Sequence, residues 1–286
     1  MRFALLIALV GTASVARAQA NDAPPPLKVN VPLDLTITGV GAAAWLSSEL
    51  LFKKQLAPAT CRWCDRDAAG NDTLNAFDRN IRDDLVWSNP HTADVLSNVA
   101  AFGLLPAVTL GGTALAAHDA GANANIGKDL LVVGEATILA QDVNQVVKFA
   151  VGRERPFVHR LPEAQKALTA QPDDNNLSFF SGHTTWAFSM ATAAGTVCSM
   201  HGYKFAPWVW AGGLTVATGT ALLRIGADKH YATDVITGAL VGTAFGIGVP
   251  RLFHQPEAVP GKTAQGMALS LGPSPAGPGI GISGQF

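Results

Sequence analysis

Long apolar segments alternate with short polar ones along the chain. The apolar segments are rich in Ala, Leu, Gly and Thr, have the length of helices and show no sustained two-residue alternation. They occupy residues 35–48, 95–117, 130–147, 184–200 and 205–250, the last with a charged break from 224 to 234. This pattern predicts an all-α protein built as a helical bundle.

A shorter segment, residues 75–87, has the pattern of an amphipathic surface helix. Charged residues separate apolar ones that recur at helical spacing, namely Leu74, Phe77, Ile81 and Leu85. We expect this helix to pack its apolar side against the bundle. Residues 156–180 contain three prolines and predict a long loop, in which the polar run from 173 to 176 is expected to be solvated.

The N-terminal residues have the pattern of a signal peptide. Residues 1–20 contain Arg2, then an apolar run, then small residues that permit cleavage after Ala18 or Ala20. Residues 21–32 include three consecutive prolines and predict an extended leader. The helical domain is then expected to occupy residues 33–254.

The C-terminal residues 255–286 are rich in Pro and Gly and differ from the helical body. Apolar residues alternate with small or polar ones in Met267-Leu269-Leu271 and again in Ile280-Ile282. Alternation around a Pro/Gly-rich turn predicts one short β-hairpin.

Composition narrows the range of functions. Lys and Arg number 20 against 21 Asp and Glu, and a net charge of -1 gives no electrostatic reason to expect nucleic-acid binding. Hydrophobic residues make up 48% of the chain and charged residues 14%, which excludes a disordered protein. Cys61-Arg62-Trp63-Cys64 lacks the strand–helix context of a redox motif, so we expect Cys61 and Cys64 to form a structural disulfide in an oxidising compartment.

Two of the apolar segments are long enough to cross a membrane. Residues 95–117 and 205–223 contain no charged residue over 23 and 19 positions. Residues 128–148, however, include Asp129, Glu135 and Asp142, and each carboxylate inside a bilayer costs about 2.5–3.5 kcal/mol. We therefore expect an exported, periplasmic bundle, with an inner-membrane protein whose site faces the periplasm as the alternative.

Basic residues occur beside the apolar segments at three separate places. Lys148 and Arg155 lie near the end of one predicted helix, where the following proline disfavours helical geometry at Arg155. Ser181 and Gly182 precede the next helix, whose free N–H groups favour an anion. Arg224 ends the helix after that. In an up-and-down bundle, these three places lie at the same end.

This set of cations and amide donors suits a phosphoryl group, whose oxygens carry the charge of the transition state. His230 is the predicted nucleophile, and Asp234, four residues later on one helical face, is expected to hold its second ring nitrogen. His183 is the expected acid for the leaving oxygen, so one neutral and one protonated histidine predict a bell-shaped pH dependence. Two histidines and one carboxylate among guanidinium groups make a poor cation site, and no metal is expected.

These residues resemble the three-part signature of the type 2 phosphatidic acid phosphatases, which class A acid phosphatases and vanadium haloperoxidases share. The parts are Lys148-x6-Arg155-Pro156, Ser181-Gly182-His183 and Arg224-x5-His230-x3-Asp234, in that order. The resemblance implies a helical bundle and metal-independent hydrolysis of phosphomonoesters through a phosphohistidine on His230. It also implies no cofactor, inhibition by vanadate, and phosphate held by Lys148, Arg155, Ser181, Gly182 and Arg224.

Two positions depart from the signature. The family usually has Pro before Ser-Gly-His, where this chain has Phe180, and Ser before the third-part Arg, where it has Leu223. Loss of that serine removes a candidate hydrogen bond to phosphate. The departure affects the expected efficiency and substrate preference more than the reaction type.

Two alternatives stay open at this point. The same cage could hold vanadate in a haloperoxidase, because vanadate mimics a pentacoordinate phosphoryl group, although the short chain disfavours this. The chain could also be a non-catalytic binder of phosphate or lipid headgroups, against which the intact histidines argue. The expected partner is a phosphorylated substrate, with lipid phosphate as the leading candidate and with membrane contact. The sequence does not determine the oligomeric state.

Overall fold

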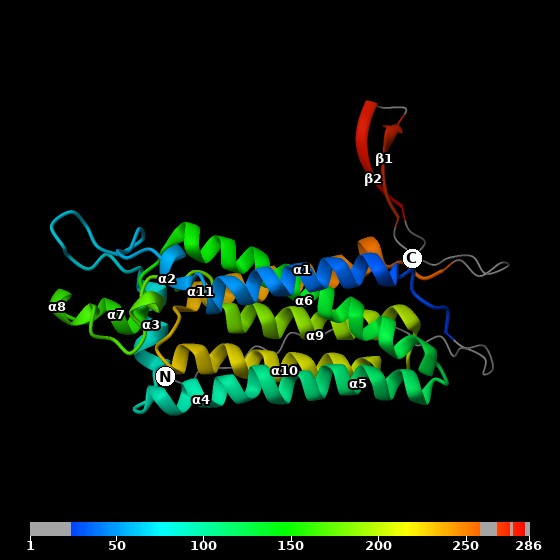
Figure 1. Cartoon of the computed structure of the whole chain (residues 1–286), viewed down its shortest axis with the longest axis horizontal. Helices are drawn as coiled ribbons and strands as arrows, with labels where there is room; N and C mark the ends of the chain where they lie inside the picture. The colour runs from blue at the N-terminus through cyan, green and yellow to red at the C-terminus, as the bar shows by residue number, and fades with distance from the viewer. Residues whose placement is uncertain (1–23, 258–267, 275–276, 284–286) are drawn as a thin grey trace.

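The computed structural model describes residues 24–257, 268–274 and 277–283. Long helices run side by side in an up-and-down arrangement (Figure 1). They are α1 (Val31–Leu50), a continuous run of α4 (Pro90–Val99), the π-helical η1 (Ala100–Leu104) and α5 (Leu105–Asp119), then α6 (Ile126–Val151), α9 (Gly182–His201), α10 (Ala206–Gly226) and α11 (Ala232–Phe253). The predicted all-α bundle is confirmed.

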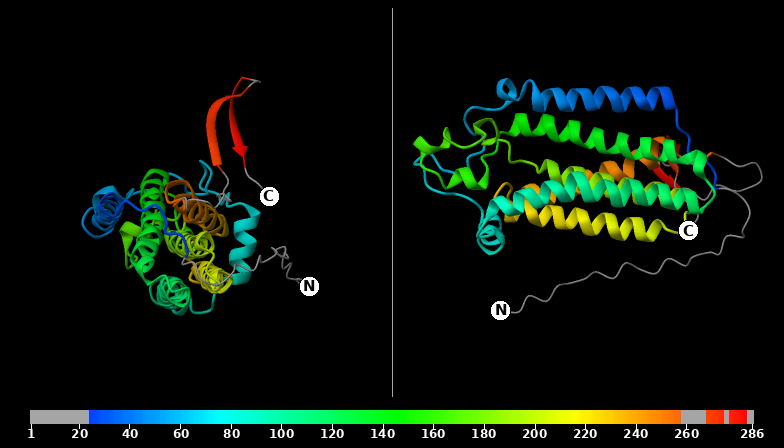
Figure 2. Two further views of the ribbon diagram at one scale, coloured as in Figure 1. Left: turned by 90° about the vertical axis from the view of Figure 1, so that its right-hand side faces the viewer. Right: turned by 60° about the horizontal axis from the view of Figure 1, so that its bottom comes forward.

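Helix α9 lies at the centre of the bundle, as the end-on view shows (Figure 2). It packs against α5, α6, α10 and α11, and most of its residues are buried. Small residues permit this packing. A Cβ at Gly242 of α11 would lie 2.6 Å from the carbonyl oxygen of Thr185, and Gly238 and Gly246 are equally crowded by the residues of α9 and its N-cap. Glycine at every fourth position therefore lets α11 approach α9 closely.

Short elements gather at one end of the bundle, on the left of Figure 1. They are α2 (Lys53–Leu56), α3 (Ala76–Leu85), α7 (Pro156–His159), α8 (Glu163–Lys166) and the 3-10 turn η3 (Pro172–Asp174). The predicted loop 156–180 thus contains three short helical turns. A further turn, η2 (Asn123–Asn125), precedes α6 at the opposite end.

Helix α6 ends earlier than the sequence predicted. Its last residue is Val151, and Gly152 follows in the left-handed conformation at φ +60°, which glycine adopts without strain. Arg155 is therefore not at the end of this helix, where the sequence predicted it. It directly precedes α7, which begins at Pro156.

The surface helix α3 follows the prediction only in part. Ile81 packs against the bundle as expected, and Leu74, just before the helix, is buried. Phe77 and Leu85 are exposed, whereas Asp78 and Arg82 are buried. The charged side chains turn inward because each finds a buried partner, Arg153 for Asp78 and Asp228 for Arg82. Paired charges thus override the apolar pattern on this helix.

Residues 24–30 are attached to the bundle and form no helix. Leu27 is 1% exposed and bridges to Pro256, and the N–H of Lys28 donates to the carbonyl of Gln255 at 3.0 Å. A buried apolar side chain therefore anchors this part of the predicted extended leader. The predicted signal peptide, residues 1–20, lies outside the described residues.

Two strands follow the helices. β1 (Ala268–Ser274) pairs antiparallel with β2 (Gly277–Ser283), with Ala268 opposite Ser283. This pairing is the hairpin that the alternating pattern predicted.

The outer surface of the bundle indicates membrane association. Three helical runs are long and apolar enough to cross a bilayer, at Pro90–Asp119, Asn123–Val151 and Ala232–Phe253. Large apolar side chains are exposed along α1, α4, η1, α6, α10 and α11. The carboxylates that were expected to oppose insertion face inward, since Asp129 and Glu135 are buried and Asp142 lies against Gly41 of α1. The argument against membrane insertion therefore fails.

Candidate active site

A cavity of about 320 Å³ lies at the end of the bundle that carries the short helices. Residues of α1, α4, α6, α9 and α10 and of the polar loops form its walls. Six of the predicted site residues line it, namely Lys148, Arg155, Gly182, His183, Arg224 and His230. The three sequence segments therefore meet at one place, as the up-and-down topology predicted.

His230 lies just before α11, in the turn that follows α10, and is 2% exposed. Its Nδ1 lies 2.8 Å from the carbonyl oxygen of Ser178, to which it donates a hydrogen bond. A neutral ring then has its lone pair on Nε2. Burial lowers the pKa of His230 well below its ordinary value, and the charges of Arg155 and Arg224 lower it further. The geometry and charge therefore favour a neutral ring with a free Nε2.

Asp234 does not hold His230 in the way the sequence predicted. Its Oδ2 lies 3.8 Å from Nδ1 of His230, beyond hydrogen-bond distance. That oxygen instead accepts from the Ser178 hydroxyl at 2.6 Å and from the Tyr231 N–H at 2.9 Å. Because Asp234 is the third residue of α11, its carboxylate caps the helix start. Ser178 thus stands between the carboxylate and the imidazole.

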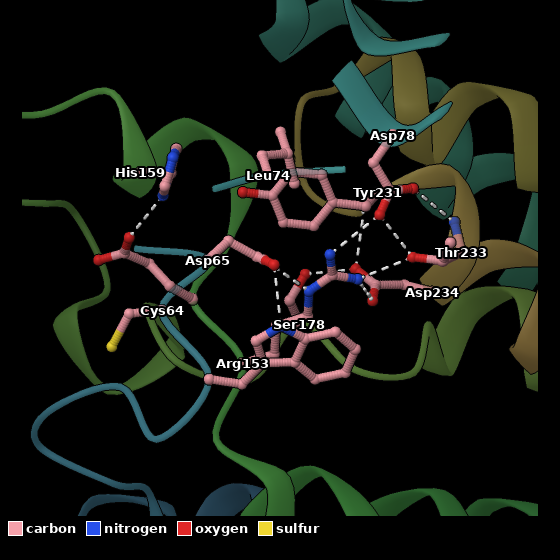
Figure 3. Close-up of polar contacts among 12 residues, drawn as sticks. Cys64, Asp65, Leu74, Asp78, Arg153, His159, Ser178, Tyr231, Thr233 and Asp234 are labelled. Carbon is pink, nitrogen blue, oxygen red and sulfur yellow. Dashed lines mark hydrogen bonds and ion pairs between the residues drawn. The ribbon is translucent and has the colours of Figure 1, made fainter. Parts of the chain in front are cut away.

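Arg153 organises the charges behind the site (Figure 3). Its guanidinium donates to Asp234 at 2.7 Å, to Asp78 at 2.9 Å and to Asp65 at 3.1 Å, and it is completely buried. The rings of Trp63 and Tyr231 cover it, each 4.2 Å away. One arginine therefore joins the 57–75 loop and α3 to the start of α11.

The three predicted phosphate-binding cations occupy different walls. Arg155 donates to the carbonyl of Asp174 at 2.7 Å, which fixes its guanidinium at the cavity. Lys148 comes from the last turn of α6 and is buried. A Cβ at Gly182 would lie 3.1 Å from its Nζ, so glycine lets the ammonium approach the start of α9.

The guanidinium of Arg224 is held by α4 through one of its nitrogens. Its Nη1 donates to Asp94 at 2.5 Å and to Ser97 at 2.9 Å, both on α4. Its Nε is buried and has no hydrogen-bond partner among the described residues. An unsatisfied buried guanidinium N–H is costly, and an anion in the cavity is a suitable acceptor for it.

His183 is the second residue of α9, and its Nε2 lies 2.6 Å from Oδ1 of Asn98. An amide oxygen only accepts, so Nε2 carries the proton in this contact. The ring of Phe102, on η1, meets the imidazole edge-on at 5.1 Å. α4 and η1 together therefore orient the predicted acid.

Ser181 occupies the N-cap position of α9 but makes no side-chain cap. It is completely buried, accepts a hydrogen bond from the Thr184 hydroxyl and does not line the cavity. Its contact with phosphate stays a prediction. The backbone around it is held from α6, where Asn144 donates to the carbonyl of Phe180 and Gln141 donates to that of Gly182.

The structure shows the surroundings of the two positions that depart from the signature, Phe180 and Leu223. Phe180 is buried and packs edge-on against Phe179 with ring centres 5.8 Å apart. Leu223 has no hydroxyl at the position where the family has serine. A different hydroxyl, that of Ser97 on α4, accepts a hydrogen bond from Arg224.

Sequence reasoning missed several residues that line the cavity. Asp94 and Asn98 come from α4, and the segment gave no signal beyond polar residues within a mostly apolar run. Asp174, expected in a solvated stretch, instead pairs with Lys53 at 2.5 Å. Burial alone would raise the pKa of Asp174, but the charges of Arg155 and Lys53 hold it below its ordinary range.

One wall of the cavity is aromatic. Trp45 of α1 stacks on Trp186 of α9 with ring centres 5.6 Å apart, and Phe102 packs beside Trp186. These three rings also line the cavity. The site therefore combines a cationic wall with an apolar one.

The predicted disulfide is present in the structure. Cys61 and Cys64 are joined, and Cys198 is a buried free thiol. The bridge closes the turn that carries Trp63, whose carbonyl accepts from the N–H of Glu154. It lies at the same end of the molecule as the cavity.

Comparison with known proteins agrees with this geometry. The PAP2 superfamily matches residues 129–257, which include all three signature segments. A lipid A 1-phosphatase of Porphyromonas gingivalis is 39% identical over 69 residues, which are 24% of this chain and about 15% of the length of that protein. Residues 129–257, just under half of this chain, are thus similar to the PAP2 superfamily.

Proposed function

We propose that this protein is a metal-independent phosphatase that hydrolyses phosphomonoesters through a phosphohistidine on His230. One observation carries the proposal, namely that three cations and two histidines from distant segments converge on a single cavity. Such convergence suits a phosphoryl group, because guanidinium and ammonium groups stabilise charge on its equatorial oxygens.

The proposed reaction has two steps. Nε2 of His230 attacks phosphorus, a P–N bond forms, and the P–O bond to the leaving group breaks while His183 donates a proton to the leaving oxygen. Water then attacks phosphorus and gives a proton to His183, the P–N bond to His230 breaks, and inorganic phosphate leaves. The Ser178 carbonyl supports the first step, since it holds the proton on Nδ1 and leaves Nε2 free.

We further propose that the substrate is a lipid phosphate. The apolar outer surface of the helices supports this, as does the aromatic wall that Trp45, Phe102 and Trp186 give the cavity. The aligned relative is named for a phosphatase of lipid A. An acyl or glycolipid portion could contact the rings while the phosphate meets the cations.

The proposed location is the inner membrane, with the cavity facing the periplasm. The disulfide supports this orientation, because it lies at the cavity end and disulfides persist in oxidising compartments. Residues 24–30 lie at the opposite end of α1 and would then be cytoplasmic. A cleaved signal peptide would place them outside instead, so a spanning bundle with a periplasmic cavity requires that the N-terminal segment is not cleaved.

The experiment is phosphate release by the purified full chain in detergent, with EDTA present. A short-chain phosphatidic acid, a lipid A-type glycosyl phosphate and a soluble aryl phosphate serve as parallel substrates. Release that vanadate blocks and that His230→Ala abolishes is the expected result, and preference for a lipid arm supports the lipid assignment. Bromide oxidation with vanadate and peroxide, without release, would favour the haloperoxidase. Tight phosphate binding without turnover would favour the non-catalytic binder.

A further inference from the structure

Two histidines pack against α6 at the end of the bundle opposite the cavity. His201 donates from Nδ1 to the carbonyl of Pro25 at 3.0 Å, and its Nε2 lies 2.8 Å from Asp129. His254 donates from Nδ1 to the carbonyl of Lys28 at 3.0 Å, and its Nε2 lies 3.1 Å from Glu135. The two sites share one arrangement, in which a backbone carbonyl holds one ring nitrogen and a carboxylate faces the other.

The two sites differ in charge. At His201 a single carboxylate is present, and both of its oxygens are partnered, because Tyr203 donates to the second one at 3.0 Å. At His254 there is a second carboxylate, that of Asp34 on α1, whose Oδ2 lies 3.9 Å from Nδ1 of His254. Only the second site therefore has a carboxylate in excess of the histidine.

The excess carboxylate is buried and unsatisfied. Asp34 is 5% exposed, and its Oδ2 has no hydrogen-bond partner among the described residues. Within the part of the chain that the structure describes, neither Asp34 nor Glu135 forms an ion pair with a Lys or Arg. His254 is their only cationic neighbour there. When both carboxylates are ionised, the cluster carries a net charge of -1 even with His254 protonated, and such a buried charge is costly without a further cation.

We propose that Asp34, Glu135 and His254 bind a divalent transition-metal ion of the Zn²⁺ or Mn²⁺ type. One ligand atom from each residue lies within 4.8 Å of those of the other two, so small side-chain movements bring them around one ion. One imidazole nitrogen and two carboxylate oxygens suit Zn²⁺ and Mn²⁺ better than Ca²⁺ or Mg²⁺, which prefer oxygen alone.

The surroundings fit this assignment. The Nδ1–H of His254 donates to the Lys28 carbonyl, which directs Nε2 toward Glu135, and such a contact is the usual outer support of a metal-bound histidine. Two carboxylates and a neutral imidazole carry -2, so a divalent ion balances the charge.

The ion would have a structural role, separate from the proposed phosphatase reaction. Its ligands come from α1, α6 and the residue after α11, so it would tie three helices and the adjacent Lys28 backbone together. Glu135 and Lys148 are 13 residues apart on α6, which places the ion about 20 Å from the cavity. The proposal therefore does not depend on the proposed function.

The test measures metal binding and thermal unfolding of the untagged full chain in detergent, after treatment with EDTA. Zn²⁺ and Mn²⁺ are added separately, with Mg²⁺ for comparison. We expect about one Zn²⁺ or Mn²⁺ per chain and a higher unfolding midpoint on its addition. Asp34→Asn and His254→Gln should bind at least about 100-fold more weakly and show no rise in midpoint.

Two matched variants serve as controls. His201→Gln removes the histidine that pairs with Asp129. Asp142→Asn removes a carboxylate of α6 that lies outside the cluster. Both variants should bind metal like the wild type. If His254→Gln fails to fold, the Asp34→Asn variant still tests the proposal. The Oδ2 of Asp34 has no hydrogen-bond partner among the described residues, so the substitution breaks no such bond at that atom. Absence of bound metal in the wild type, or equal binding by Asp34→Asn, would overturn the proposal.

Discussion

His230 and Asp234 are four residues apart, yet their side chains are connected through Ser178. The Ser178 carbonyl accepts from Nδ1 of His230 at 2.8 Å, and its hydroxyl donates to Oδ2 of Asp234 at 2.6 Å. The carboxylate and the imidazole are themselves 3.8 Å apart. Asp234 is therefore a positioning residue that fixes the 178 segment, and the backbone carbonyl fixes the ring.

Because Asp234 reaches His230 only through Ser178, we expect Asp234→Asn to have a mild effect on catalysis. We expect kcat to fall about 10- to 100-fold with little change in KM, because the Ser178 carbonyl still holds Nδ1. A carboxylate that directly orients a catalytic histidine costs about 10⁴-fold when it is changed to the amide. Steady-state kinetics of Asp234→Asn beside Ser178→Ala measure the difference. A loss near 10⁴-fold would mean that Asp234 contacts His230 in the working state.

The acid limb of the pH profile of kcat/KM should occur at low pH. Burial and the neighbouring cations hold the pKa of His230 well below 6.5, so the ring stays neutral as the pH falls from 7 through 6.5. The value of kcat/KM is expected to stay level over that range and to fall only at lower pH, where protonation removes the nucleophile. The assay uses an aryl phosphate whose own ionisation is measured separately. An acid limb at pH 6.5 or above contradicts this expectation.

Arg153 should be essential to stability rather than to substrate binding. Arg153→Gln leaves three buried or nearly buried carboxylates without their shared partner, and breaking a buried ion pair costs about 3–5 kcal/mol. Thermal unfolding in detergent should show a large fall in the midpoint. Arg160→Gln breaks an exposed pair with Asp83 and is the matched control, with a cost of about 1 kcal/mol or less. Equal midpoints for the two variants would refute the assignment.

Asn98 is expected to act through His183. Asn98→Ala removes the acceptor that orients the imidazole, so kcat should fall about 10-fold while KM changes little. A similar Asn–His contact exists at the opposite end, where Asn123 lies 2.9 Å from His118. Asn123→Ala should leave both parameters unchanged. A change confined to KM in Asn98→Ala would instead place Asn98 on the substrate.

The proposed membrane orientation can be tested with single cysteines. Arg160 is exposed at the cavity end and Lys204 is exposed at the opposite end. In intact cells, a membrane-impermeant maleimide that reaches the periplasm should label Arg160→Cys, and should label Lys204→Cys only after lysis. The wild type is the control, because Cys198 is buried and the other cysteines are paired. Labelling of both positions in intact cells would indicate a bundle that does not span the inner membrane.

The helices and the convergence of the site could be predicted from sequence. Each long apolar segment became a helix, because length and composition are local properties. Short connections between antiparallel helices then required that Lys148, His183 and Arg224 lie at one end. The spacing of the signature supplied six of the residues that line the cavity, both histidines among them.

Only the tertiary structure determined how the charges pair. Asp78 and Arg82 turn inward on α3 because Arg153 and Asp228, far away in sequence, neutralise them. Asp234 faces Arg153 and Ser178 rather than His230 for the same reason. The carboxylates of α6 likewise disfavoured membrane insertion until their burial was known. Sequence alone thus determined which segments are helical and which end holds the chemistry, whereas partners for buried charges depend on long-range contacts that no local pattern encodes.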